Sequence, residues 1–266
     1  MAAKSFLKRP LGGLALVMLL AVSLASHAED VSKQFPLDGF TRIELKGNSQ
    51  LEVVQGDTFE VIATGSKEVV ELAVAEVRGD TLELSVRDKH RRFFGVVTVS
   101  DSEGVDYRVV LPRLESLEVT GSGDARAELL ESETLDLEVT GSGSLRVNKV
   151  AAESLQAAVT GSGDLTLGTV LAVEGRASIK GSGDIRLDSV IGDSFGAEIK
   201  GSGDMVVGGK VASLSVSIMG SGDFLGRNLQ SDSAEGAVMG SGDVVLRRPA
   251  KESFTVMGSG DIALVD

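Results

Sequence analysis

The stretch EVTGSGDARAELLESETLDLEVTGSGSLRV, residues 118–147, contains nearly the same tetrapeptide twice, twenty residues apart. Gly-Ser-Gly-Asp begins at Gly121, Gly161, Gly181, Gly201, Gly220, Gly240 and Gly258, and a copy at Gly141 ends in Ser144 instead of Asp. The successive steps are 20, 20, 20, 20, 19, 20 and 18 residues. So regular a period is typical of repeat architectures, in which each repeat is one structural unit stacked on the next.

Apolar residues alternate around every copy of the motif. In the first copy, Val119 lies two residues before the first glycine, and Ala125 and Ala127 lie four and six residues after it. The equivalent positions of the other copies are also apolar, apart from Gly226. Even spacing predicts strands whose alternate side chains face a core, and glycine at this density disfavours helices.

The period and the alternation together predict an all-β chain that folds as a right-handed parallel β-helix, a solenoid with about 20 residues per coil. The right hand follows the preference of parallel β crossovers. The alternative is an antiparallel meander with Gly-Ser-Gly-Asp as its hairpin loop. A meander does not explain why the side chains match so strictly from repeat to repeat.

The segment before the repeats contains a degenerate ninth copy. IELKGNSQLEV, residues 43–53, aligns with LEVTGSGSLRV, residues 137–147. Because repeat arrays need atypical ends to shield an open core, we expect residues 29–115 to form an N-terminal lead-in or cap. Coils are expected over 116–266, so that 29–266 is one continuous domain. Alternation predicts strands in the lead-in over 58–63, 70–77, 80–87, 95–101 and 105–111.

Residues 1–28 have the pattern of a secretory signal peptide. Lys4, Lys8 and Arg9 precede the apolar run LGGLALVMLLAVSLA, and SHA precedes a predicted cleavage site after Ala28. The alternative, an uncleaved signal anchor, is disfavoured because the apolar run is short and wrongly flanked for a membrane span. We therefore expect an exported, secreted protein, either in the periplasm, associated with the outer membrane or extracellular.

Charge and composition exclude several classes of function. The chain has 26 Lys and Arg against 39 Asp and Glu, a net charge of −13 that becomes −16 once the three basic residues of the signal are removed. Such a surface repels nucleic acid as a whole, so no nucleic-acid partner is expected. The chain has no cysteine, and His90 is the one histidine outside the signal. Disulfides, thiolate chemistry and sites that need two histidines are therefore excluded.

Three segments in series carry a family resemblance. RIELKGNSQLEVVQGD, then YRVVLPRLESLEVTGSGD, then the serial Gly-Ser-Gly-Asp coils resemble the family of the auto-transporter adhesin head GIN domain. The resemblance covers about residues 35–264. It implies a parallel β-helix that is exposed to the envelope or exterior of a bacterium. The chain departs from the family's name in that no membrane barrel follows the coils before Asp266.

The glycines of the motif have a predicted structural role. If alternation continues through the motif, both glycines point inward, where a bend or a close backbone approach leaves no room for a Cβ atom. Ser and Asp then point outward. The glycines concerned are Gly121, Gly123, Gly141, Gly143, Gly161, Gly163, Gly181, Gly183, Gly201, Gly203, Gly220, Gly222, Gly240, Gly242, Gly258 and Gly260.

The aspartates of the motif would form a row of like charges along one edge. At a spacing of about 4.8 Å, two carboxylates in water repel by roughly 0.9 kcal/mol. Three interactions would offset this repulsion. In the first, Asp and Ser accept backbone N–H groups at the bend. In the second, nearby Arg126, Arg146 and Arg186 compensate the charge, and in the third, calcium bridges adjacent coils. Apart from calcium, no cofactor is expected. The candidate calcium ligands are Asp124, Asp164, Asp184, Asp204, Asp223, Asp243 and Asp261.

The C-terminal repeats carry apolar residues at positions that should face outward. Met219, Met239 and Met257 directly precede the motif, and Leu225 and Val245 occupy the position taken by arginine in earlier repeats. Exposed apolar patches often mark contacts, and Met is common at adaptable binding surfaces. We hypothesise that the C-terminal coils, which have no evident cap, contact a partner or a second copy. The alternative is that the alternation slips at the motif and buries these residues.

RDKHRRFF, residues 87–94, is a basic and aromatic cluster in an acidic protein. One interpretation is a loop that touches an anionic surface or a glycan, with Arg91 and Arg92 as contacts. The alternative is a solvated hairpin tip, which is the more common role of a charge run.

These observations predict a non-catalytic protein that offers a rigid, acidic surface for adhesion or scaffolding in the bacterial cell envelope. Its partner would be an envelope protein or a glycan. The alternative is a protein that binds or cleaves polysaccharide with the Asp edge. Cleavage is disfavoured because acid–base chemistry needs two carboxyls in unlike environments, whereas the repeated aspartates occupy equivalent ones.

Overall fold

The computed structural model describes residues 30–87, 91–93, 96–98 and 104–266, and the side chains of 91–93 and 96–98 lie outside that description. The predicted signal peptide also falls outside the described residues. Within them, no helix is long and apolar enough to cross a membrane. Eighteen strands join one continuous sheet system, and β7 (Arg91–Phe93) and β8 (Val96–Thr98) form a separate antiparallel pair.

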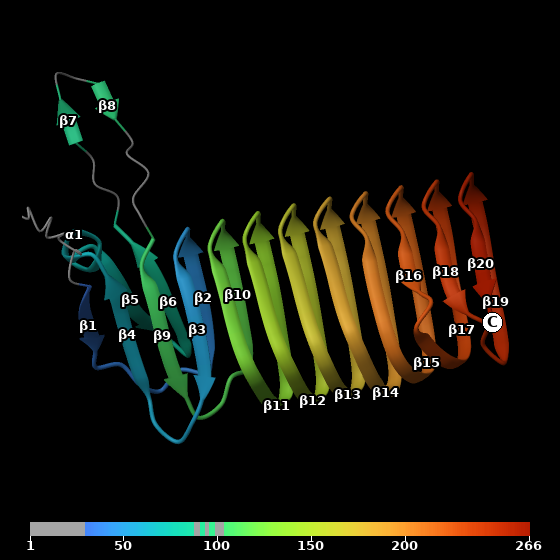
Figure 1. Ribbon diagram of the computed structural model, residues 1–266, viewed down its shortest axis with the longest axis horizontal. Helices are drawn as coiled ribbons and strands as arrows, with labels where there is room; N and C mark the ends of the chain where they lie inside the picture. Colours follow the sequence, from blue (N-terminus) through green and yellow to red (C-terminus); the bar gives the residue numbers. More distant parts are fainter. Residues whose placement is uncertain (1–29, 88–90, 94–95, 99–103) are drawn as a thin grey trace, which may run out of the picture.

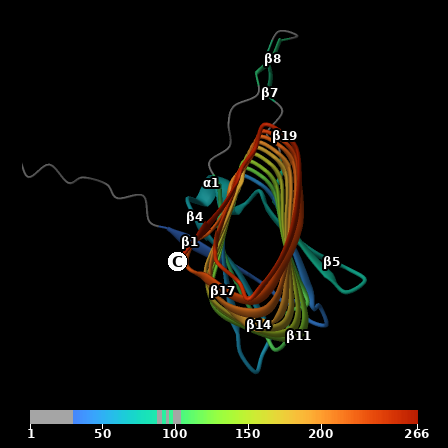
Figure 2. The ribbon, with the colours of Figure 1, turned by 90° about the vertical axis from the view of Figure 1, so that its right-hand side faces the viewer.

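The repeats form a β-solenoid, which confirms the predicted fold class (Figure 1). From Ser116 to Gly201 each coil pairs in parallel with the next at a shift of 20 residues, as in Val139 with Val159 and Val159 with Ile179. In the later coils the shift is 18 to 20 residues. Viewed down the rod, the coils superpose as one flattened loop (Figure 2). The coil strands are β10 (Ser116–Gly121), β11 (Asp124–Gly141), β12 (Ser144–Gly161), β13 (Asp164–Gly181), β14 (Asp184–Gly201), β15 (Met205–Gly220), β16 (Phe224–Gly226), β17 (Leu229–Gly240), β18 (Val244–Arg247), β19 (Lys251–Gly258) and β20 (Ile262–Val265).

The core consists of apolar rows that run along the rod. The residue two before each motif is fully buried from Val119 to Val238. The residues four and six after the first glycine are buried through Val244 and Leu246. Each coil therefore buries the apolar face of its neighbour, which is the source of stability in a repeat array.

The shorter step between Gly201 and Gly220 is absorbed at one place. The register between β14 and β15 shifts between Leu187 and Val190, where Gly209 adopts a positive φ of 112°. Gly209 therefore takes the place of Lys210 in the row, in register with Val190 and Leu229, and Lys210 is exposed. The interruption of the apolar row at Lys210 is thus a local bulge and leaves the rest of the coil in register.

The lead-in continues the solenoid and then closes it with antiparallel strands. β2 (Arg42–Gly47) and β3 (Gln50–Gln55) pair in parallel with β10 and β11, so the degenerate ninth copy is a true coil, with Gly47 opposite Gly121. Beyond them, β6 (Thr81–Val86) and β9 (Asp106–Leu111) add in parallel, whereas β5 (Ala73–Arg78), β4 (Glu60–Gly65) and β1 (Val31–Phe35) add antiparallel. These strands cover the N-terminal end of the rod (Figure 1).

The strand boundaries predicted for the lead-in were approximate. The prediction of a strand over 70–77 was wrong at its start, because Lys67–Val70 form a short helix, α1, and β5 begins at Ala73. Val69 and Val70 of α1 are buried, so the same apolar residues reach the core from a helical turn. The predicted strand over 95–101 falls partly outside the described residues, and its described part is β8.

Candidate functional site

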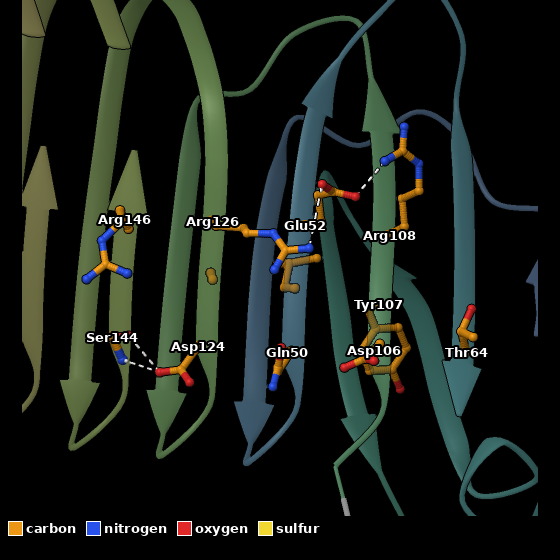
Figure 3. Close-up of a pocket in the computed structure, with 12 residues that line it drawn as sticks. Gln50, Glu52, Thr64, Asp106, Tyr107, Arg108, Asp124, Arg126, Ser144 and Arg146 are labelled. Atoms are coloured by element: carbon orange, nitrogen blue, oxygen red, sulfur yellow. Dashed lines mark hydrogen bonds and ion pairs between the residues drawn. The ribbon is translucent and has the colours of Figure 1, made fainter. Parts of the chain in front are cut away.

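An open groove of about 540 Å³ lies on the outward face of one sheet, where β4, β9, β3, β11 and β12 run side by side (Figure 3). A second hollow of about 410 Å³ adjoins it and shares Glu52, Arg126 and Arg146. We call the first hollow the arginine groove. Its lining residues are Gln50, Leu51, Glu52, Thr64, Asp106, Tyr107, Arg108, Asp124, Ala125, Arg126, Ser144 and Arg146.

Strand register brings the charged residues of the groove into one row. Glu52 on β3 is opposite Arg108 on β9 and Arg126 on β11, and Arg126 is opposite Arg146 on β12. All four point outward, because they sit between inward-facing residues of their strands. Residues as far apart in sequence as Glu52 and Arg146 thus become neighbours on a single face.

One carboxylate serves two of the three guanidinium groups. Arg108 Nη1 lies 2.5 Å from Glu52 Oε2, and Arg126 Nη2 lies 3.7 Å from Glu52 Oε1. Figure 3 shows both guanidinium groups directed toward Glu52. Within the part of the chain that the structure describes, Arg146 forms no ion pair. The row therefore carries excess positive charge on a protein whose net charge is −13.

The motif aspartates form a second row beside the arginines, and at the groove they are part of a short hydrogen-bonded series. Ser144 Oγ donates to Asp124 Oδ1 at 2.6 Å, and the Ser144 backbone N–H donates to the same oxygen at 3.2 Å. Ser144, the one departure from the motif, thus replaces a repelling carboxylate by a hydrogen-bond donor.

Further along the rod, the aspartate side chains bond to the backbone of the next coil. The N–H of Asp204 donates to Asp184 Oδ1 at 2.8 Å, and the same contact links each later aspartate to the one before it, at Asp223, Asp243 and Asp261. The N–H of Asp164 instead donates to the carbonyl oxygen of Gly143 at 3.1 Å, and the N–H of Ser144 donates both to the carbonyl oxygen of Gly123 at 3.1 Å and to Asp124 Oδ1. The first of the three explanations, backbone N–H acceptance, accounts for this second half of the row.

The other two explanations find less support. Arg126 pairs with Glu52, and Arg186 pairs with Asp188 at 2.8 Å. Across residues 30–87 and 104–266, none of the arginines forms an ion pair with a motif aspartate. No group of three or more His, Cys, Asp or Glu in the described residues could hold a metal ion. A calcium ion that bridged adjacent coils would therefore be limited to pairs of carboxylates, and the structure does not test this third explanation.

The motif glycines sit where the backbones of adjacent coils approach most closely. The first glycine of every copy has a positive φ, for example 130° at Gly181. At Gly183, a Cβ atom would lie 2.1 Å from the carbonyl oxygen of Gly163. The second glycine of each copy is buried and the serine after the first glycine is exposed, whereas the first glycine is half-buried in most copies and exposed at Gly258.

The apolar row of the C-terminal coils continues the arginine row. Arg186 is opposite Val206, Val206 is opposite Leu225, and Leu225 is opposite Val245. Leu225, Val245 and Met219 are half-buried, whereas Met239 and Met257 are 39% and 57% exposed. The face therefore changes from charged to apolar along the rod.

Arg91 and Arg92 lie on β7, and their side chains are outside the description.

Tyr107 supports the groove from below. Its ring is 2% exposed, and its hydroxyl lies 2.6 Å from the carbonyl oxygen of Ser85 and 3.1 Å from that of Val74. Burial raises the pKa of Tyr107 to about 12. The hydroxyl thereby ties the β5–β6 hairpin to β9, the strand that positions Arg108.

The sequence analysis did not identify either partner of the ion pair between Glu52 and Arg108. Glu52 could have been found, because the alignment of the ninth copy places it in the column of Arg146. Arg108 gave no such signal, since β9 carries no motif and its register with β3 is a property of the folded lead-in.

Comparison with protein families matches residues 39–175 and 168–265 to the family described as "Putative auto-transporter adhesin, head GIN domain". No curated protein matches the chain.

Several solved structures share the fold. A "putative adhesin" from Bacteroides fragilis is 21% identical, with a TM-score of 0.70 over 89% of this chain and 97% of the other. A "putative adhesin" from Parabacteroides merdae is 18% identical, with a TM-score of 0.77 over 90% and 98%. A "putative lipid binding protein" from Parabacteroides distasonis is 18% identical, with a TM-score of 0.75 over 90% and 98%. At these identities the likeness establishes the fold alone.

Proposed function

Because the chain belongs to the family of the auto-transporter adhesin head GIN domain, we propose that it is an exported, non-catalytic binding module of the bacterial cell envelope. Family membership supports an adhesin-like binding role. The signal-peptide pattern of residues 1–28 supports export. A rigid rod that displays repeated side chains at a fixed spacing suits adhesion or scaffolding, since solenoids offer extended surfaces to large ligands.

The arginine groove is the observation that carries the proposal. It combines guanidinium donors at Arg126 and Arg146 with carboxylate acceptors at Glu52 and Asp124 on neighbouring strands. Such a mixture can hydrogen-bond the hydroxyl and carboxylate groups of a glycan or the polar surface of an envelope protein. Its openness to solvent suits an extended ligand better than an enclosed small molecule.

Binding is favoured over cleavage because the carboxylates of the groove are already engaged. Glu52 is paired with two arginines, and Asp124 accepts two hydrogen bonds from Ser144. A glycoside-cleaving site needs one carboxyl kept protonated as an acid and a second one opposite it. The polysaccharide alternative is therefore retained in its binding form.

The experiment is a binding screen of the purified protein against an array of bacterial and host polysaccharides and against isolated outer-membrane fractions. Replacing Arg126 and Arg146 together by Gln is expected to abolish the binding that the unmodified protein shows. Arg186→Gln is the matched control, because Arg186 lies in the same row but is paired with Asp188. Binding that survives the double substitution, or is lost equally with Arg186→Gln, would contradict the role of the groove.

A further inference from the structure

The last coil of the rod leaves its core partly open. Val256 is 40% exposed, whereas its partner one coil earlier, Val238, is fully buried. Ile262 and Leu264 are half-buried, although the equivalent Val244 and Leu246 are buried. Apolar side chains of one coil are normally covered by the next coil. In the last coil the side chains at these core positions are therefore apolar but partly exposed to solvent.

The strands at this end also have free backbone edges. β19 pairs with β17 and β20 pairs with β18, and no other strand of the described chain pairs with either. β19 begins with Lys251 and Glu252, and from Ser253 to Val265 the single charged residue is Asp261. Natural sheets protect free edges with charges, proline or bulges, and an uncharged exposed edge pairs readily with another strand.

The opposite end of the rod is protected in the expected way. The outermost described strands there, β1 and β5, each pair on one side only, and they carry Lys33, Glu76 and Arg78. The ion pair between Arg78 and Glu76 belongs to this end. The two ends therefore differ, and a chain of rods joined head to tail would place the uncharged edge against a charged one.

We propose that two copies of this protein join end to end through β19 and β20, with the edge strands of the two copies antiparallel about a two-fold axis. A two-fold contact is self-complementary, so each uncharged edge meets its own copy. Two molecules with a net charge of −13 each repel, and this segment is where they can approach with little added repulsion. Because the edge strands at the other end are charged, the assembly closes at a dimer and does not extend into a fibre.

The exposed methionines widen the proposed contact. Met257 on β19 is opposite Met239 on β17, and both side chains point outward next to the free edge. Methionine adapts its shape to an apposed surface, so this pair can pack against the partner copy beside the paired backbones. This interface is independent of the arginine groove, and a failure of either proposal leaves the other untouched.

The first test is the mass of the purified protein by light scattering and by sedimentation over a range of concentrations. Twice the monomer mass is expected, with dissociation on dilution. Met257→Lys, alone and with Thr255→Lys, is expected to raise the concentration needed for dimerisation by about tenfold or more. Lys is tolerated at this position of the coil, since Lys180 and Lys200 occupy it in other repeats.

Thr160→Lys is the matched control, because Thr160 takes the same position in a coil at the middle of the rod. It is expected to remain dimeric. Circular dichroism of each variant establishes that the coils are intact. A monomer at every concentration, or a dimer that Met257→Lys leaves unchanged, would overturn the proposal.

A second test uses the absence of cysteine in the chain. Met257→Cys is expected to form a disulfide-linked dimer under mild oxidation, and Thr160→Cys is expected to remain unlinked. Equal linkage at the two positions would mean random collision and would contradict a specific end-to-end contact.

Discussion

The backbone N–H of Asp223 donates to Oδ1 of Asp204, one coil earlier, at 2.9 Å. Both residues hold the last position of the motif and both are half-buried. The strands β15 and β16 begin just after these aspartates, so the carboxylate takes the place of a backbone acceptor where the ladder is interrupted. The side chain thus continues the inter-coil bonding through the bend.

Asp204→Ala removes this acceptor and leaves the N–H of Asp223 without it. We expect a loss of about 1 kcal/mol in the free energy of unfolding, the usual net value of one hydrogen bond. Urea denaturation measures it. Asp164→Ala is the matched control, because in the described structure the Asp164 side chain accepts no hydrogen bond from the next coil. Equal losses for the two substitutions would contradict the assignment.

Gly183→Ala is expected to destabilise the solenoid far more than an ordinary surface substitution. The added Cβ atom would lie 2.1 Å from the carbonyl oxygen of Gly163 and 2.8 Å from Val159 Cγ1, so the coils must move apart. We expect a loss of about 3 kcal/mol, at the upper end for overpacking. Thermal and urea unfolding measure it.

Gly196→Ala is the control for that prediction. Its added Cβ atom would meet nothing closer than Arg176 Nε at 3.8 Å, and Gly196 has no positive φ. Its effect is expected within about 0.5 kcal/mol. A similar loss at both positions would mean that the cost comes from glycine replacement in general and not from the close approach of the coils.

Tyr107 predicts a loss of stability at alkaline pH. Its pKa is about 12 in the folded protein and about 10 in an unfolded chain. The folded state therefore holds the proton more tightly, so this contribution is complete below about pH 10 and declines as the pH rises toward 12. Tyr107 is the one tyrosine of the chain and there is no tryptophan. Near-ultraviolet phenolate absorbance thus reports it alone, and a folded-state midpoint near 10 would contradict the prediction.

Calcium provides a fourth test. Because no three acidic side chains of the described residues converge, we expect the melting temperature in EDTA and in a calcium titration at physiological salt to agree. A ligand that binds the folded state raises stability with its concentration. A large, saturable rise would instead establish calcium binding along the aspartate row, and Asp184→Asn would then be expected to reduce it.

The coils were predictable because one short-range pattern sets them. Gly-Ser-Gly-Asp recurs with apolar neighbours such as Val159 and Leu165, and stacking equivalent residues aligns those rows without any long-range information. The lead-in follows no such period. Its strands β4 and β1 pair antiparallel, and Val69 and Val70 reach the core from a helical turn. Both features depend on the shape of the core space that the other strands leave, which a local sequence pattern does not encode.

The site was less predictable than the fold. The arginine column was visible in Arg126 and Arg146, but their expected partners were the motif aspartates, whereas Arg126 reaches Glu52. Alternation in the sequence predicts which face of the sheet a side chain lies on, but not which residue it contacts. A long side chain such as that of Arg126 reaches several neighbours on that face. Among the described residues, the carboxylates of Asp124 and Asp184 accept the N–H of the next coil and that of Asp164 does not. This difference has no counterpart in the motif, which is identical at Asp164 and Asp184.

The stacking of the coils has a mechanical consequence. The hydrogen bonds between neighbouring coils, such as those between β12 and β13, run close to the long axis of the rod. A force along that axis, applied at a chain end, loads the bonds of the outermost interface one after another, so the end coil peels off at low load. A force along the strands shears all the bonds of an interface together and meets far greater resistance. A tether that withstands flow would therefore pull across this rod and not along it.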